Sequence, residues 1–317
     1  MADITAARIN NLQSSINLIL GSGSGENGYG QTVTSSPVNN TGDVVLAADM
    51  NSIYADILAA RIHQVGAGDI GIAEVIAGPA LELIPQPADT RGNIVAEDTS
   101  NYIDNQGVTS IDLDGFKKGI VDFESLMTQV QADKTIIHPT QATLEPAIAS
   151  ARTSTWNGLI YHEVAVTFSS ANAKRFFFNT GGEIRLSANN TSASTSKGLE
   201  WAQLCSQIGT IKFSANTTTA SNGGGQSVGN YNLTSAYQLL YQKVGNGAVY
   251  GGNVYTVKAR SDIDTRIIFR IEFNDLVQVG NIDNNVDGRL ESTIQTYRAS
   301  GGISVLAPTY YNTSTLA

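Results

Sequence analysis

The chain has 317 residues, a net charge of −9 at pH 7, 15% charged residues and one cysteine. A single cysteine excludes a disulfide framework and a zinc site built from cysteines alone. The acidic charge and the scarcity of Lys and Arg clusters argue against general nucleic-acid binding, which needs such clusters to displace counterions. No stretch approaches the roughly 18 apolar residues of a membrane span. We therefore expect partners that are neither nucleic acid nor membrane.

The charge divides unevenly along the chain. Residues 1–150 hold 6 basic and 18 acidic residues, whereas residues 151–317 hold 13 basic and 10 acidic residues. Such asymmetry indicates two segments with different surroundings. We expect an attachment and oligomerisation region over 1–150 and a separate domain over 151–317. The N-terminus has neither a basic n-region nor an apolar h-region, so we expect no secretory signal.

Three helices are predicted in the N-terminal half. Residues 5–20 place apolar side chains at spacings of three and four, and residues 47–64 and 115–133 repeat that pattern. Residues 65–113 predict irregular structure, partly strand, because they are rich in Pro, Gly, Asp and Asn. The apolar faces pack within their own domain in the favoured interpretation, or form a coiled-coil seam in the alternative. The candidate assembly contacts on these faces are Ile9, Leu12, Ile16, Ile19, Phe116 and Phe123.

From Trp156 onward the hydrophobic period changes to two. Apolar and polar residues alternate over 160–168, 183–187, 211–215, 255–259, 267–274 and 290–296. This alternation is typical of antiparallel strands with one buried face. About eight strands with glycine-rich turns between them predict a β-sandwich or jelly-roll-like domain. The predicted fold class is therefore α+β, with a helical, loop-rich N-terminal region before an antiparallel β-sandwich.

One helix interrupts the predicted strands. Ser196 is its expected N-cap, and Gly209 ends it. Its expected buried face carries Leu199, Ala202, Cys205 and Ile208. Cys205 is then a small core residue rather than a catalytic thiol, which would need an exposed, electropositive setting. His162 lies on the apolar face of a strand, where a hydrogen-bonded core histidine is the expected role.

Patterns for cofactor and metal binding are incomplete. Residues 23–28 match G-x-G-x-x-G, but a helix precedes them and a polar loop follows, so a flexible linker is predicted instead of a dinucleotide site. Asp283, Asn285 and Asp287 begin like a calcium loop, but Ile294 occupies the position of the bidentate Glu. An Asx-rich turn is the favoured interpretation, with calcium as the alternative. We expect no cofactor and no enzymatic activity.

Residues 174–178 are the one basic and aromatic run. Lys174 and Arg175 precede three phenylalanines, which could form a stacking platform for single-stranded nucleic acid. No second basic cluster supports such a groove. The favoured interpretation is a strand buried on both faces.

The segment 175–187 (RFFFNTGGEIRLS) resembles a signature of virion structural proteins from tailed bacteriophages, most closely the contractile-tailed cyanophages. Further segments that resemble this family are 12–25, 28–31, 60–64, 152–158, 162–168 and 229–234. Both halves of the chain take part, so the likeness covers most of it. The resemblance implies a viral structural protein of the virion, assembled in the host cytoplasm, and no catalytic residues. It also implies that Gly181 and Gly182 form a tight hairpin.

We expect a tail, baseplate or tail-fibre protein that contacts other virion proteins and itself, as a homotrimer or a higher ring. The alternatives are a head or neck decoration protein and a glycan-binding adhesin. Host surface glycans would stack on aromatic rings, for which the candidates are Tyr231, Tyr250 and Tyr310. An enzymatic depolymerase is the remaining rival and needs a carboxylate-lined groove.

Overall fold

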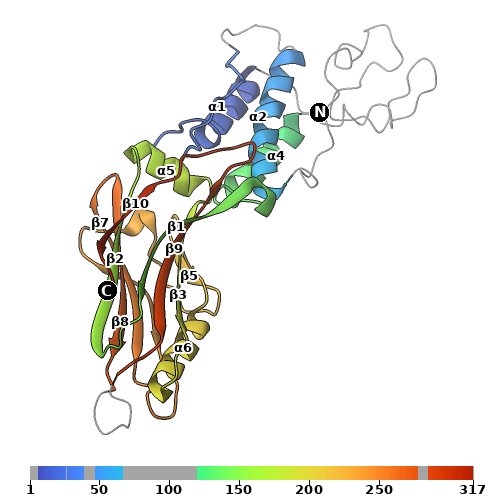
Figure 1. Cartoon of the computed structure of the whole chain (residues 1–317). Coiled ribbons are helices and arrows are strands. Elements are labelled where there is room, and N and C mark those ends of the chain that lie inside the picture. The colour runs from blue at the N-terminus through green and yellow to red at the C-terminus, as the bar shows by residue number, and fades with distance from the viewer. Residues whose placement is uncertain (1–5, 26, 39–46, 67–119, 278–284, 317) are drawn as a thin grey trace, which may run out of the picture. The chain divides into compact units, whose positions relative to one another are not determined.

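The computed structural model describes residues 6–25, 27–38, 47–66, 120–277 and 285–316, which form two compact units (Figure 1). The helical unit comprises Met1–Ala142 with Ala299–Ser304, and the β-unit comprises Thr143–Arg298 with Val305–Ala317. The division thus falls after Ala142. The expected irregular segment 65–113 lies almost wholly outside the described residues.

Three helices build the helical unit: α1 (Ala6–Ile19), α2 (Ala47–Val65) and α4 (Ile120–Ala132). Each of them contacts the other two. Their apolar faces meet in a core that contains Ile9, Leu12, Ile16, Ile53, Ile57, Phe123, Leu126 and Val130. The spacing of three and four therefore serves packing inside the unit. A short 3₁₀ turn, η2 (Pro139–Gln141), follows α4.

A tight turn follows α1. Its backbone closes on the helix end, because Tyr29 N donates to Ile19 O (2.7 Å) and Gln31 N donates to Leu20 O (2.9 Å). A Cβ on Gly28 would lie 2.2 Å from the carbonyl oxygen of Gly21, so this close approach requires glycine. The predicted flexible linker is wrong here: the glycines allow the chain to turn back on itself.

Two five-stranded sheets form the β-unit. The first has the order β1 (Ala142–Arg152), β9 (Arg289–Ala299), β3 (Glu183–Thr191), β4 (Ile211–Phe213) and β5 (Thr218–Ala220). The second has the order β10 (Thr309–Ser314), β2 (Gly158–Thr167), β8 (Arg266–Asp275), β7 (Val254–Ile263) and β6 (Gln238–Val244). The pairs with a described register are antiparallel. The predicted α+β class with a β-sandwich is confirmed.

The segment 174–178 is helical, so the strand expected there is wrong. It lies in α5 (Ala171–Asn179), whose N-cap Ser170 accepts a hydrogen bond from Ala173 N (3.0 Å). The hairpin expected at 181–182 is also wrong. Gly181 has a φ of +86° and follows the end of the helix. Helices commonly end at a residue in this left-handed conformation, and the chain then continues into β3.

The helix α6 (Ser196–Ile208) lies alongside β3 (Figure 1). Its N-cap is Thr195 rather than Ser196, and Leu199 is 54% exposed rather than buried. The buried face instead carries Lys197, Gly198, Trp201, Leu204, Cys205 and Ile208. A second 3₁₀ turn, η3 (Asn230–Asn232), follows β5. Among the described residues, none of the helices combines the length and the apolar character that crossing a membrane requires.

Candidate functional site

The expected assembly residues lie in the core of the helical unit. Ile9, Leu12, Ile16, Ile19 and Phe123 are at most 5% exposed. Their side chains are already covered by their own chain, so their position does not favour contact with a partner. Phe116, the remaining candidate, lies outside the described residues.

Of the tyrosines expected to stack on sugars, Tyr250 is buried, and Tyr231 and Tyr310 are partly exposed. Tyr250 is 3% exposed, so it offers no face to a ligand. The hydroxyl of Tyr231 donates to Asn179 Oδ1 at 2.7 Å. The hydroxyl of Tyr310 lies 2.5 Å from Thr296 Oγ1, and burial raises the Tyr310 pKa above its ordinary value. The structure does not bring these three rings together as one exposed platform.

Asp287 closes a turn instead of standing free for calcium. Its carboxylate accepts hydrogen bonds from the backbone N and the hydroxyl of both Ser194 and Thr195, at 2.6–3.2 Å. A Cβ on Gly198 would lie 2.0 Å from Oδ1 of this carboxylate. Asp283 lies outside the described residues, and within the described ranges no group of His, Cys, Asp and Glu could hold a metal ion.

Cys205 and His162, which the sequence predicts to be structural core residues, are both buried. Burial raises the pKa of Cys205 to about 12, so its thiol stays protonated and unreactive at neutral pH. His162 is fully buried, with Nδ1 3.0 Å from Ser292 Oγ and Nε2 2.8 Å from Asn312 Oδ1. Because an amide oxygen only accepts, Nε2 carries the proton and donates to Asn312.

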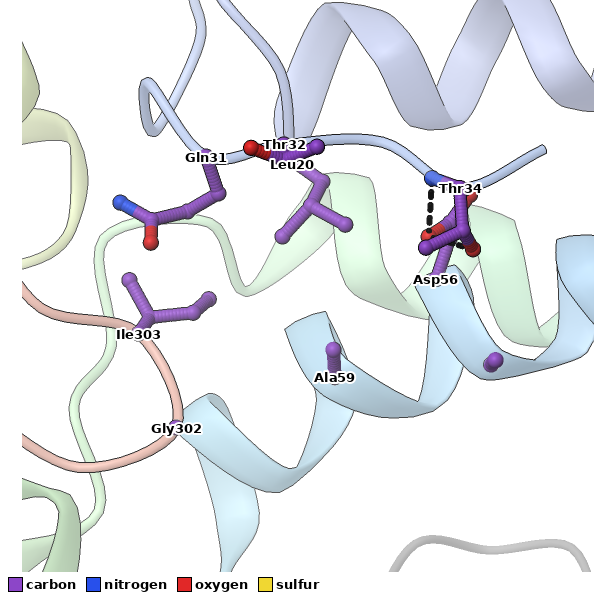
Figure 2. Close-up of a pocket in the computed structure, with 9 residues that line it drawn as sticks. Leu20, Gln31, Thr32, Thr34, Asp56, Ala59, Gly302 and Ile303 are labelled. Carbon is purple, nitrogen blue, oxygen red and sulfur yellow. Dashed lines mark hydrogen bonds between the residues drawn. The ribbon is translucent and has the colours of Figure 1, made fainter. Parts of the chain in front are cut away.

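A pocket of about 330 Å³ lies in the helical unit, between α2 and the segment after α1 (Figure 2). Its acidic residue, Asp56, accepts hydrogen bonds from Thr34 N (3.0 Å), Thr34 Oγ1 (2.7 Å) and Ser35 N (2.8 Å). Gln31, on the opposite wall, donates to Ser304 O at 3.1 Å. The hydrogen bonds of Asp56 and Gln31 therefore connect segments of the helical unit to one another.

The feature that sequence reasoning missed is the outer face of the second sheet. Register aligns Val244 with Val254, Val254 with Asn274 and Asn274 with Leu159, so these residues form one row across β6, β7, β8 and β2. Leu159 and Val244 are each 49% exposed, and Val254 is partly exposed. We call Leu159, Val244 and Val254 the apolar row. The sequence contained a signal for this face: each of the three residues is apolar although it occupies a position of its strand that should face solvent.

Beyond the apolar row, the same outer face is charged and aromatic. The guanidinium of Arg270 lies 3.9 Å from the centre of the Tyr161 ring, a cation–π arrangement. Glu272 forms ion pairs with Arg270 (3.0 Å) and with Lys258 (2.8 Å). Because the charged groups have partners, the unfavourable contact of this face with water comes mainly from its exposed apolar side chains.

Comparisons with protein-family models, with curated proteins and with solved structures found no match to this chain. Residues 175–187 are the segment for which the sequence suggests a resemblance to virion structural proteins. That segment forms the second half of α5, the turn at Gly181 and the first part of β3. In the fold it supplies core packing, since Phe177 and Phe178 are fully buried.

Proposed function

We propose that the chain is a structural component of a tailed-phage virion, placed on the tail, baseplate or fibre apparatus and assembling through protein–protein contacts. The resemblance of residues 175–187 to virion structural proteins supports a role in the phage particle. The apolar row is the observation that supports assembly, because exposed apolar groups gathered on one face are typical of interaction surfaces. The partner is a second copy of the chain, in a trimer or higher ring, or a neighbouring virion protein.

The apolar row is suited to such a contact on energetic grounds. Fully burying a Leu or Val side chain contributes about 1.5–3 kcal/mol. Leu159 and Val244 lie three strands apart, so the row spans roughly 14 Å at about 4.8 Å per strand. A partner segment laid across the row would cover both side chains. The ion pairs of Glu272 beside it would form a polar rim, as interfaces commonly have.

The test uses a double substitution, Leu159→Lys with Val244→Lys, in a phage that lacks its own copy of the gene. We expect the variant to fold and to be lost from purified particles, because charged residues replace the contact. The matched control is Leu306→Lys, an exposed apolar residue of the β-unit that lies outside the strands. Normal incorporation of the double variant would refute the role of the row.

Immunogold electron microscopy with an antibody against the β-unit tests the placement. Label at the tail tip supports a tail, baseplate or fibre protein. Label on the head or neck would favour the decoration alternative, and unlabelled particles would overturn the virion proposal. The glycan-binding alternative has less support, because Tyr250 is buried and the hydroxyls of Tyr231 and Tyr310 are engaged. A glycan array that finds a ligand would restore it.

A further inference from the structure

A lysine and an aspartate meet inside the β-unit with no exposure to solvent. Lys197 lies in the first turn of α6, and Asp275 is the last residue of β8. Nζ of Lys197 is 2.7 Å from Oδ2 of Asp275, and both side chains are 0% exposed. The two residues are far apart in sequence, and the elements that carry them are labelled in Figure 1.

Buried aromatic residues lie near this pair in the sequence of the same two elements, and a third ring contacts Lys197. Trp201 lies one turn after Lys197 on the buried face of α6, and Phe273 precedes Asp275 by two residues on the inner face of β8. The rings of Trp201 and Phe273 lie 6.0 Å apart. The Tyr250 ring centre is 5.7 Å from Lys197 Nζ. The pair thus lies in a part of the β-unit that is rich in buried aromatic rings, and neither side chain of the pair is exposed to water.

Burial disfavours the ionised form of this pair. Removing both charges from water costs several kcal/mol per ion, which their attraction offsets only in part. A proton passed from Nζ to the carboxyl group would leave a neutral amine beside a neutral acid.

We propose that Lys197 and Asp275 condense to an intramolecular isopeptide bond that joins α6 covalently to the end of β8. The lone pair of the neutral Nζ attacks Cγ of the protonated carboxyl group. The C–OH bond then breaks, and the hydroxyl leaves as water with a proton from Nζ. No oxidant or co-reactant is needed, and the product is an Nζ–Cγ amide.

The geometry meets the first requirement of this reaction, which is close contact between the amine and the carboxyl group. Bond formation is fast when the reacting atoms are held about 3–3.5 Å apart, and Nζ is already in contact with an oxygen bonded to Cγ. Burial raises the pKa of Asp275, although the hydrogen bond and charge of Lys197 partly oppose this. The shift is in the direction of the protonated acid that the reaction needs. Exclusion of water also protects the amide from hydrolysis. This inference does not depend on the proposed function.

The experiment is intact mass spectrometry of the purified, denatured full-length chain, followed by peptide mapping. We expect a mass one water lower than the sequence mass. Trypsin should then fail to cleave after Lys197, and one branched peptide should contain both Lys197 and Asp275. A chain at its full sequence mass, with the two residues in separate peptides, would overturn the proposal.

The double variant Lys197→Met with Asp275→Leu is the control, because apolar residues of similar volume can replace a buried ion pair without loss of the fold. It should retain the circular dichroism spectrum of the wild type and show its full sequence mass. A water loss that persists in this variant, or that maps to the Asp287-Gly288 step as a succinimide, would also refute the bond. Peptide mapping of the wild type alone decides the question if the variant does not fold.

Discussion

At the scale of single residues, the Asp287 carboxylate connects the turn before β9 with the start of α6. Partial burial by itself would raise its pKa, but hydrogen bonds from Ser194 and Thr195 outweigh that effect and lower the pKa to about 2. Because the pKa in the folded state is below the ordinary value of about 3.9, the carboxylate stabilises the fold above that pH. Its contribution falls as the pH drops from about 4 toward about 2.

We predict that Asp287→Asn lowers the free energy of unfolding by about 1–2 kcal/mol at pH 7, the range for a lost charged cap. Urea denaturation of both proteins at pH 7 and at pH 3 measures the effect. The difference between wild type and variant should shrink at the lower pH, since protonation removes the same interaction from the wild type. An equal difference at both pH values would contradict this role of Asp287.

His162 gives a second pH dependence. Burial lowers its pKa, and the hydrogen bond to Asn312 offsets this only in part. A histidine with a lowered pKa in the folded state takes up its proton more readily when unfolded. Stability is therefore full above the unfolded pKa of about 6.5 and falls as the pH decreases below it.

Replacing this histidine with Gln, a neutral residue able to donate and accept, tests that expectation. We predict that thermal stability declines less steeply between pH 7 and pH 5 in His162→Gln than in the wild type, because the variant has no proton to gain at this site. Differential scanning calorimetry across that range supplies the measurement. Identical slopes would show that other groups govern the acid side of the stability curve.

At the scale of elements, most of the correctly predicted helices and strands were predicted from local hydrophobic periodicity. The helices over 6–19, 47–65 and 120–132 and the strands β2, β7 and β8 follow from spacings of three to four or of two. The prediction failed at α5, where three consecutive aromatics suggested a buried strand. The missed signal was Ser170, whose side chain caps the helix, and an N-cap outweighed the local β-propensity of Phe.

The buried face of α6 shows why the candidate sites could not be read from the sequence. Hydrophobic periodicity selected Leu199, which is exposed, and passed over Lys197, which is fully buried. Lys197 is buried because Asp275 meets it, and that contact spans two separate elements. The apolar row has the same character: register across four strands brings Leu159 and Val244 onto one face, and single-strand patterns do not contain register.

At the scale of the whole molecule, each unit has its own core. The helical core contains Leu12 and Phe123, and both tryptophans of the chain, Trp156 and Trp201, lie in the β-unit. Tryptophan fluorescence therefore reports on the β-unit alone. A Leu12→Asp variant would place an unpaired charge in the helical core. If this variant were not incorporated into particles, the cause would be the damaged core rather than a missing contact with a partner.

We predict that the two units unfold separately. Leu12→Ala should destabilise the helical unit by about 2–5 kcal/mol, the range for truncating a buried Leu. Hydrogen exchange should then accelerate for amides of α1, α2 and α4, while exchange in β2 and β8 and the fluorescence transition in urea stay unchanged. Asn11→Ala, an exposed position on the same helix, is the matched control. Equal acceleration in β8 would mean that the units unfold as one cooperative body, because only shared stability transmits a local loss to a distant strand.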